Sequence, residues 1–199
     1  MTTAAPAIQG LIQAAFLVSA VSLAGVAHVL WLRHATSLRY AVALDGGRCF
    51  HGKRIFGDHK TMRGFMIMIP ACGLSFALMW VICLALPDWL VSGLWELSSW
   101  QYGLLGLWAG LGFMLGELPN SFVKRRLDIA PGAAPSHGAQ RYLFAVVDRI
   151  DSILGLLLFV HLAVGVDALA WVMALVIGAL IHLVFSAFLY QSNVKARVA

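Results

Sequence analysis

Hydrophobic residues occupy five long stretches of the chain that contain no Asp, Glu, Lys or Arg. They lie at residues 1–32, 64–87, 97–116, 152–166 and 168–194. A bilayer core needs about 20 apolar residues as a helix, so four of the stretches are long enough to span a membrane. The fourth is long enough only if it begins near Tyr142, which brings Asp148, Arg149 and Asp151 into the cytoplasmic end of a membrane helix. The pattern predicts an all-α, polytopic membrane protein with about five transmembrane helices.

Composition and the order of the stretches support this interpretation. The 199 residues are 61% hydrophobic and 12% charged, which leaves too little polar surface for a water-soluble globule. The first stretch does not resemble a cleavable signal peptide, because the first basic residue, Arg33, follows the apolar run instead of preceding it. We therefore predict one transmembrane domain, 1–199, with cytoplasmic loops at about 33–63 and 119–141.

The basic residues predict the orientation. All 14 Lys and Arg residues fall in the two predicted loops, just beyond the second, or in the tail, whereas the opposite connections hold only Asp88, Glu96 and Asp167. Basic loops tend to stay in the cytoplasm, so the N-terminus is predicted outside and the C-terminus inside. We expect a multi-pass protein of the cell (inner) membrane.

Two carboxylates near the start of the fourth helix are candidate metal ligands. Asp148 and Asp151 are three residues apart, so their side chains share one helix face. Such a pair near the headgroup boundary needs a positive partner, and Mg²⁺ binds carboxylate oxygens together with substrate phosphates. Glu117, at the end of the third stretch, is either a third ligand or an ordinary carboxylate at a helix end. The alternative for Asp148, Arg149 and Asp151 is an internal salt bridge to a neighbouring helix.

Two segments resemble motifs of a known enzyme family. The run 116–125, GELPNSFVKR, followed by Asp148-Arg149-Ile150-Asp151, resembles the signature of the CTP-dependent phosphatidate cytidylyltransferases, which make CDP-diacylglycerol. The run 52–64, GKRIFGDHKTMRG, resembles the loop of the short archaeal-type branch, the CDP-archaeol synthases. The chain departs from the phosphatidate enzymes in having Glu117 in place of an aspartate and a longer spacer before Asp148.

The resemblance implies a reaction in which an oxygen of a lipid phosphate attacks the α-phosphorus of CTP and pyrophosphate leaves, at a site facing the cytoplasm. Asp148, Asp151 and Lys124 would be catalytic, with Mg²⁺ held by Asp148, Asp151 and Glu117. Asp58 would either accept from the cytosine amino group or fix nearby basic side chains, and Thr61 and Ser121 would donate to phosphate or cap helices. The implied substrate-binding residues are Lys53, Arg54, Asp58, Lys60, Thr61, Arg63, Ser121, Lys124 and Arg125.

Other functions fit the sequence less well. A membrane transporter or binding protein for an anionic solute would use the same basic loops, but it predicts charges along a path across the bilayer, and the five stretches have none. A CDP-alcohol phosphotransferase is rejected because Asp45-Gly46-Gly47-Arg48 lacks the rest of that family's motif. We expect no nucleic-acid partner. Two Gly-x-x-x-Gly pairs in the third stretch favour close helix packing, either within one chain or in a homodimer.

Overall fold

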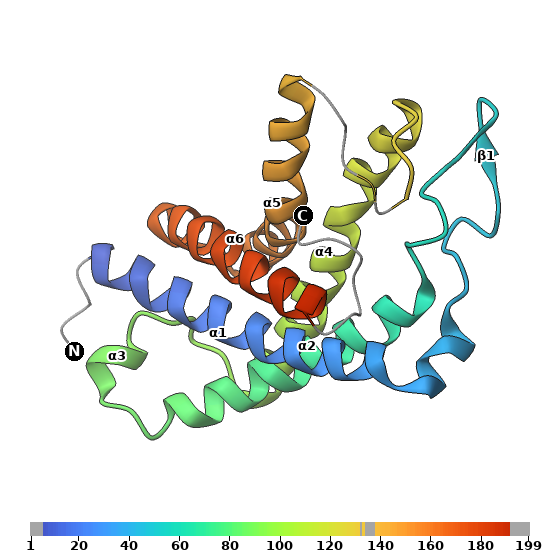
Figure 1. The fold of residues 1–199 in the computed structure, drawn as a ribbon. Coiled ribbons are helices and arrows are strands. Elements are labelled where there is room, and N and C mark those ends of the chain that lie inside the picture. Colours follow the sequence, from blue (N-terminus) through green and yellow to red (C-terminus); the bar gives the residue numbers. More distant parts are fainter. Residues whose placement is uncertain (1–5, 132, 134–137, 192–199) are drawn as a thin grey trace.

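The computed structural model describes residues 6–131, 133 and 138–191, and these are mostly helical (Figure 1). The long helices are α1 (Pro6–Arg33), α2 (Met62–Cys83), α4 (Ser99–Arg126), α5 (Ala139–Val164) and α6 (Ala168–Gln191). Shorter elements lie between them, namely the 3₁₀ helix η1 (Ala35–Tyr40), the strands β1 (Cys49–Phe50) and β2 (Lys53–Arg54), and α3 (Asp88–Val91). The mostly helical fold agrees with the sequence.

Helix α4 is longer than its apolar stretch. It begins after Ser98, whose backbone N–H donates to Gln101 Oε1 at 2.7 Å in a capping box. It then continues through Pro119 to Arg126, so the connection that we expected to begin at about residue 119 begins at Leu127. Pro119 removes one helical N–H, but the helix continues through it because α4 is packed on both sides. The three cations in the last turn stabilise the C-terminal end of the helix, where the helix dipole is negative.

Helix α5 begins slightly before the predicted start near Tyr142. It runs from Ala139, so Asp148, Arg149 and Asp151 lie about three turns into a continuous helix. The sequence predicted that the fourth helix begins before these charged residues. The structure confirms that one helix contains them.

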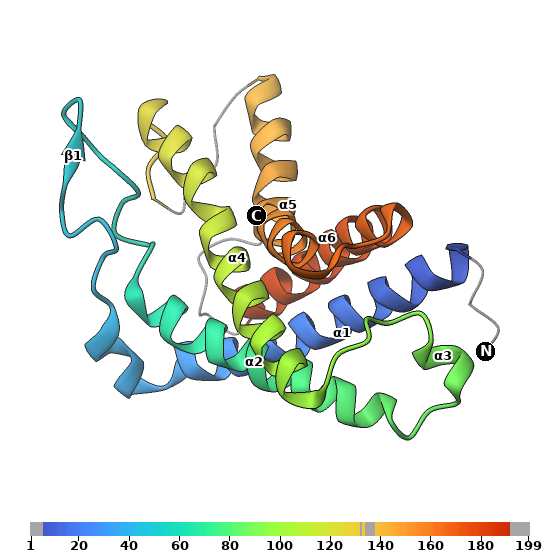
Figure 2. The ribbon, with the colours of Figure 1, turned by 180° about the vertical axis from the view of Figure 1, so that it is seen from behind.

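The helices are arranged so that α4 lies between α2 and α5, while α1 packs against α2 and α6 (Figures 1 and 2). Glycines allow the close approach of α4 to both neighbours. A Cβ built on Gly110 would lie 2.9 Å from Cys72 Cβ of α2, and one built on Gly116 would lie 2.9 Å from Gly155 Cα of α5. The glycines predicted to pack helices thus do so within one chain, and a homodimer stays a prediction.

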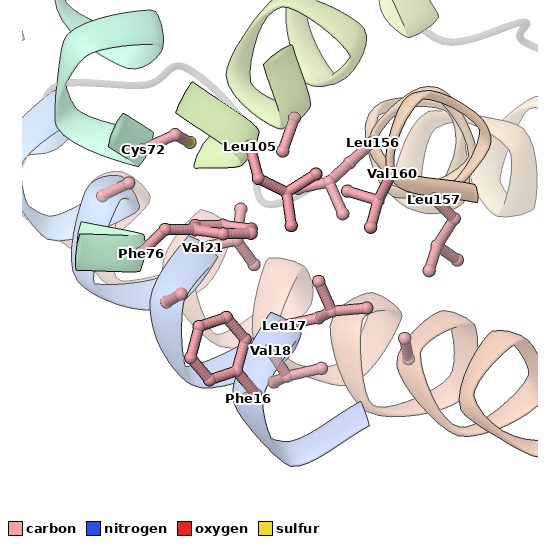
Figure 3. Packing of buried hydrophobic residues seen from close by; sticks show 14 of the residues in the cluster. Phe16, Leu17, Val18, Val21, Cys72, Phe76, Leu105, Leu156, Leu157 and Val160 are labelled. Carbon is pink, nitrogen blue, oxygen red and sulfur yellow. The ribbon is translucent and has the colours of Figure 1, made fainter. Parts of the chain in front are cut away.

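Buried apolar side chains fill the space between α1, α2, α4, α5 and α6 (Figure 3). The ring of Phe16 packs edge-on against Phe76 with centroids 5.4 Å apart, and Trp80 stacks on Tyr102 at 4.5 Å. Such aromatic pairs stabilise a core beyond the area they bury. This packing fixes the mutual positions of α2 and α4, on which the polar site depends.

Two of the helices are long and apolar enough to cross a bilayer, judged on the part of the chain that the structure describes. They are Ala7–Arg33 and Met62–Cys83, and a shorter apolar run occupies Ala168–Val184. The count of five spans, their orientation and the domain boundaries stay predictions.

Candidate active site

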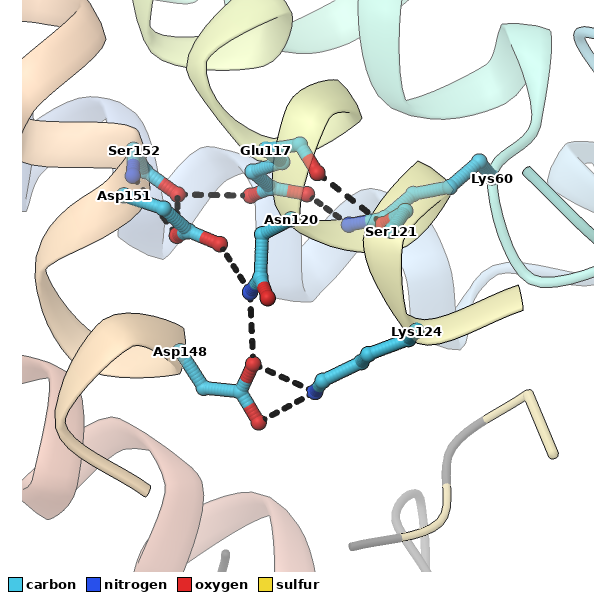
Figure 4. Close-up of polar contacts among 8 residues, drawn as sticks. All are labelled: Lys60, Glu117, Asn120, Ser121, Lys124, Asp148, Asp151 and Ser152. Atoms are coloured by element: carbon cyan, nitrogen blue, oxygen red, sulfur yellow. Dashed lines mark hydrogen bonds and ion pairs between the residues drawn. The ribbon is translucent and has the colours of Figure 1, made fainter. Parts of the chain in front are cut away.

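The polar centre of the molecule lies where α4 faces α5 (Figure 4). Asn120 Nδ2 of α4 donates to Asp148 Oδ1 and to Asp151 Oδ2, each at 2.7 Å. Lys124, one turn further along α4, donates to Asp148 Oδ2 at 2.6 Å. The two aspartates therefore share one helix face, as their spacing predicted, and that face meets two side chains of the neighbouring helix.

Glu117 has different partners from the two aspartates. Its Oε1 accepts from Ser152 Oγ at 2.8 Å, and its Oε2 is paired with Lys60, which precedes α2. The Lys60 and Glu117 side chains are only 25% and 23% exposed. Burial lowers the pKa of Lys60, but the attraction of Glu117, Asp151 and Asp148 outweighs it and raises the pKa above its ordinary value. Lys60 is therefore a fixed cation beside the carboxylates.

The donor set at this site suits Mg²⁺, which prefers oxygen ligands. Asp148 and Asp151 offer carboxylate oxygens that Asn120 Nδ2 bridges, and Asn120 Oδ1 is buried with no hydrogen-bond partner among the described residues. Among the described residues, no three His, Cys, Asp or Glu side chains lie together closely enough to hold a metal ion. Glu117, the predicted third ligand, pairs with Lys60, and its role as a metal ligand stays a prediction. Asn120 is the side chain of α4 that contacts both aspartates.

Asp45 organises a basic loop that we define as residues 41–61. Its carboxylate pairs with Arg54 and accepts from the backbone N–H groups of Phe56 and Gly57, both at 3.0 Å, and from that of Gly47 at 3.1 Å. The Arg54 guanidinium lowers the pKa of Asp45 well below its ordinary value. Burial raises this pKa, but the three backbone amides lower it further. Sequence reasoning missed this role, although Asp45-Gly46-Gly47 is a typical turn sequence.

Arg126 joins the basic loop to the end of α4. Its guanidinium donates to the carbonyl oxygens of Phe50, Lys53 and Arg54, the last at 2.6 Å. Lys53 in turn donates to Asp128 Oδ2 at 2.6 Å, in an exposed ion pair. Because Arg126 was not among the predicted binding residues, its carbonyl contacts are a further feature that only the structure reveals.

Three further predicted binding residues, Asp58, Arg125 and Ser121, contact different parts of the structure. Arg54 Nη1 contacts Asp58 Oδ1 at 2.8 Å, which agrees with Asp58 fixing a basic side chain. Arg125 is only 8% exposed, and within the described part of the chain its buried Nε and Nη1 have no hydrogen-bond partner. It lies under the loop, since a Cβ on Gly57 would be 3.2 Å from its Nη1. Ser121 Oγ donates to Glu117 O at 2.9 Å, within its own helix.

Two predicted residues lie at the start of α2. Thr61 occupies the N-cap position without a side-chain capping bond, and Arg63 is in the first turn.

Taken together, five of the predicted residues form one connected group, namely Lys60, Glu117, Lys124, Asp148 and Asp151 (Figure 4). Lys53, Arg54 and Asp58 belong to the surface of the basic loop.

Comparison with known proteins gives one consistent family. The family model described as CarS-like, CDP-archaeol synthase, matches residues 36–198. The CDP-archaeol synthase of Methanococcus aeolicus is 29% identical over 154 residues, which are 76% of this chain and 80% of that protein. The CDP-archaeol synthase of Halobacterium salinarum is 35% identical over 130 residues, 65% of this chain and 62% of that protein.

A third relative, the CDP-archaeol synthase of Methanopyrus kandleri, is 32% identical over 129 residues, 64% of this chain and 61% of that protein. No solved structure gives a significant match. The comparisons define a nucleotidyltransferase of the CTP-dependent cytidylyltransferase class. Within that class, the chain belongs to the CDP-archaeol synthase family. A transporter or binding protein without chemistry is therefore not retained as an alternative.

Proposed function

We propose that this protein transfers the cytidylyl group of CTP to a membrane lipid phosphate, archaetidate-like or phosphatidate-like, and releases pyrophosphate. The observation that carries the proposal is the connected polar group between α4 and α5. It combines a carboxylate pair bridged by Asn120 with two cations, Lys124 and Lys60, from separate elements. Both kinds of group are needed, because carboxylates hold a metal cation and basic side chains neutralise the triphosphate.

The reaction brings two anions together. A phosphate oxygen of the lipid forms a bond to the α-phosphorus of CTP while the bond from that phosphorus to the pyrophosphate oxygen breaks, and the pyrophosphate keeps the electron pair. The nucleophile is already anionic, so stabilising charge matters more than removing a proton. Mg²⁺ held by Asp148 and Asp151 would supply further neutralisation of the triphosphate.

The side chains of this chain have separate tasks in the proposal. Lys124 lies beside Asp148 and would neutralise the phosphate that reacts. Lys60, fixed by Glu117, would hold the basic loop against the nucleotide, and the buried Arg125 beneath Gly57 would add a positive charge to the same side. Asp45 and Arg126 would maintain the loop conformation through their backbone contacts.

We also propose where the reaction takes place. CTP arrives from water, whereas the lipid chains stay in the bilayer, so the site would lie at the cytoplasmic face of a multi-pass inner-membrane protein. The two apolar helices α1 and α2, together with the one-sided basic charge, support this placement.

The test is to incubate the purified protein with CTP, Mg²⁺ and a panel of lipid phosphates and to measure CDP-lipid and pyrophosphate together. We expect equal amounts of both products with at least one lipid. Asp148→Asn and Asp151→Asn should each lower kcat by about 100-fold or more, as expected for losing a group that anchors metal or reacting phosphate.

Asp128→Asn is the matched control, because this carboxylate is exposed and, among the described residues, its ion pair is with Lys53. Its activity should stay within about twofold, since exposed ion pairs contribute little. Absence of product with every lipid, or equal activity in the Asp148 and Asp151 variants and the control, would refute the proposal.

A further inference from the structure

A cavity of about 190 Å³ lies inside the helix assembly, next to the carboxylate group and away from the basic loop. Residues of α1, α2, α4, α5 and α6 form its walls. Most of these lining residues are apolar, including Val21, Met68, Phe113 and Ile181. The polar side chains in its wall include His28, Glu117, Arg149, Ser152 and His182. The cavity is thus amphipathic, with several ionisable side chains in an otherwise apolar wall.

The cavity and the candidate active site share part of their walls. Glu117 and Ser152 line the cavity, and the hydrogen bond between Ser152 Oγ and Glu117 Oε1 is 2.8 Å long. The same hydroxyl lies 3.2 Å from Asp151 Oδ1, which Asn120 bridges to Asp148. A ligand in the cavity would therefore be next to the group that we propose to bind the nucleotide phosphates.

Arg149 gives the cavity its positive charge. The only hydrogen bond of its guanidinium within the described residues is to Ala145 O of its own helix, and it forms no ion pair there. Asp148 and Asp151 face Asn120 on α4, and Asp148 forms its salt bridge to the neighbouring helix, the alternative that the sequence left open, with Lys124. Arg149 takes no part in this salt bridge. Among the described residues that line the cavity, the carboxylate is that of Glu117, which is already paired with Lys60. A guanidinium without a counter-ion in an apolar surround calls for an anion.

We propose that this cavity binds the phosphate head of the lipid substrate, with Arg149 and His28 contacting the phosphate and the apolar walls contacting the glycerol and first methylenes. The inference rests on the proposed function for its choice of ligand, a phosphate monoester of a two-chain glycerolipid. The apolar walls favour a lipid over free phosphate, because a hydrated inorganic ion would gain nothing from Val21, Met68 or Phe113. The nucleotide and the lipid would then approach the carboxylates from different sides.

Lipid binding can be measured without turnover. The purified protein in micelles is titrated with a radiolabelled two-chain glycerolipid phosphate in the absence of CTP, using the wild type, Arg149→Gln, Arg149→Lys and the control Arg141→Gln. Arg141 is exposed in the first turn of α5 and does not line the cavity. We expect Kd to rise about tenfold or more in Arg149→Gln and about threefold or less in Arg149→Lys, with Arg141→Gln unchanged, as for loss of a charge-assisted contact.

Two further arms identify the ligand. The neutral lipid with the same chains should not compete, and inorganic phosphate should compete only weakly. Full competition by inorganic phosphate, or unchanged lipid affinity in Arg149→Gln, would overturn the inference. If CDP-lipid forms normally while Arg149→Gln binds lipid normally, the inference fails and the proposed function stands. If lipid binding depends on Arg149 but no CDP-lipid forms, the proposed function fails and the cavity assignment stands.

A second pair of variants covers the case in which the Arg149 variants do not fold. Ser22 lines the cavity, and its hydroxyl donates to Val18 O of its own helix, whereas the adjacent Leu23 is exposed and lies outside the cavity. Ser22→Phe should fill the space and raise KM for the lipid about tenfold while leaving KM for CTP unchanged, as expected for loss of binding to one substrate. Leu23→Phe should change neither. Equal effects of the two variants, or an effect of Ser22→Phe on CTP alone, would contradict the inference.

Discussion

The backbones of α4 and α5 come into direct contact where Gly116 meets Gly155. A Cβ added to Gly116 would lie 2.9 Å from Gly155 Cα and would also meet the carbonyl oxygen of Asp151. One turn away on α4, Asn120 reaches both aspartates of α5 at 2.7 Å. The close glycine contact therefore sets the distance across which the candidate active site is built.

We predict that Gly116→Ala impairs both the site and the fold. The methyl group would push α5 away from α4, with an overpacking cost of about 1–3 kcal/mol. Activity should fall about tenfold or more, because Asn120 and Lys124 would lose their positions opposite the aspartates. Pyrophosphate release and the melting temperature in micelles measure the two effects.

The control for this variant is Gly103→Ala on the same helix. There the nearest atoms to an added Cβ are 3.8–3.9 Å away, at ordinary contact distance. The second variant should keep its activity and gain slightly in stability, because alanine favours helix. If the two variants behave alike, the Gly116–Gly155 contact does not position the site.

Much of this arrangement could be predicted from the sequence. Charge-free stretches located the long helices, and the spacing of Asp148 and Asp151 placed both on one helix face. These features are periodic or compositional, so they are visible within a single segment. The exception was Pro119, where a local rule predicted a loop but packing on both sides of α4 keeps the chain helical to Arg126.

The parts that the sequence could not supply depend on contacts between distant segments. Asn120 is an ordinary polar residue until α5 faces it, and Lys60 pairs with Glu117 across 57 positions. Asp45 similarly acquires its role only when Arg54, Phe56 and Gly57 fold back onto it. Such pairings follow from tertiary packing, which no local pattern records.

Lys60 and Lys53 should differ in their contribution to stability. Lys60→Met leaves Glu117 without its cation in a pair that is about three-quarters buried, so the free energy of unfolding should fall by about 1–3 kcal/mol. Lys53→Met removes an exposed pair, whose side chains are 38% and 78% exposed, together with a hydrogen bond to Arg126 O, and should cost about 1 kcal/mol or less. Urea or thermal unfolding in micelles measures both.

A double variant separates the charge effect from a loss of packing. In Lys60→Met/Glu117→Gln no uncompensated charge remains, so stability should recover by about half or more, whereas activity should not. If the double variant is as unstable as Lys60→Met alone, then the loss comes from packing and the ion pair is not responsible.

The basic loop should show a pH dependence that comes from Asp45. Because folding lowers the pKa of Asp45, its stabilisation is complete above the ordinary carboxyl pKa of about 3.8 and is lost as the pH falls through the lower folded value. Asp45→Asn should therefore speed amide hydrogen exchange at Phe56 and Gly57 strongly at pH 7. The difference from wild type should narrow at pH 3. A constant difference at the two pH values would mean that shape, and not charge, gives Asp45 its role.

Asn120 should affect how much Mg²⁺ the reaction needs. Its amide nitrogen donates to both aspartates, and its buried oxygen has no hydrogen-bond partner in the part of the chain that the structure describes. Asn120→Ala therefore removes the group that orients the carboxylate pair. We expect EDTA to abolish activity in the wild type and the half-saturating Mg²⁺ concentration to rise about 10–100-fold in Asn120→Ala, the usual effect of losing a group that orients metal ligands. High Mg²⁺ should then restore part of kcat.

Ser99→Ala, at the opposite end of α4, is the control and should need the same Mg²⁺ concentration as the wild type. If Asn120→Ala lowers kcat at every Mg²⁺ concentration without changing the half-saturating value, Asn120 contacts the substrate and does not orient metal ligands.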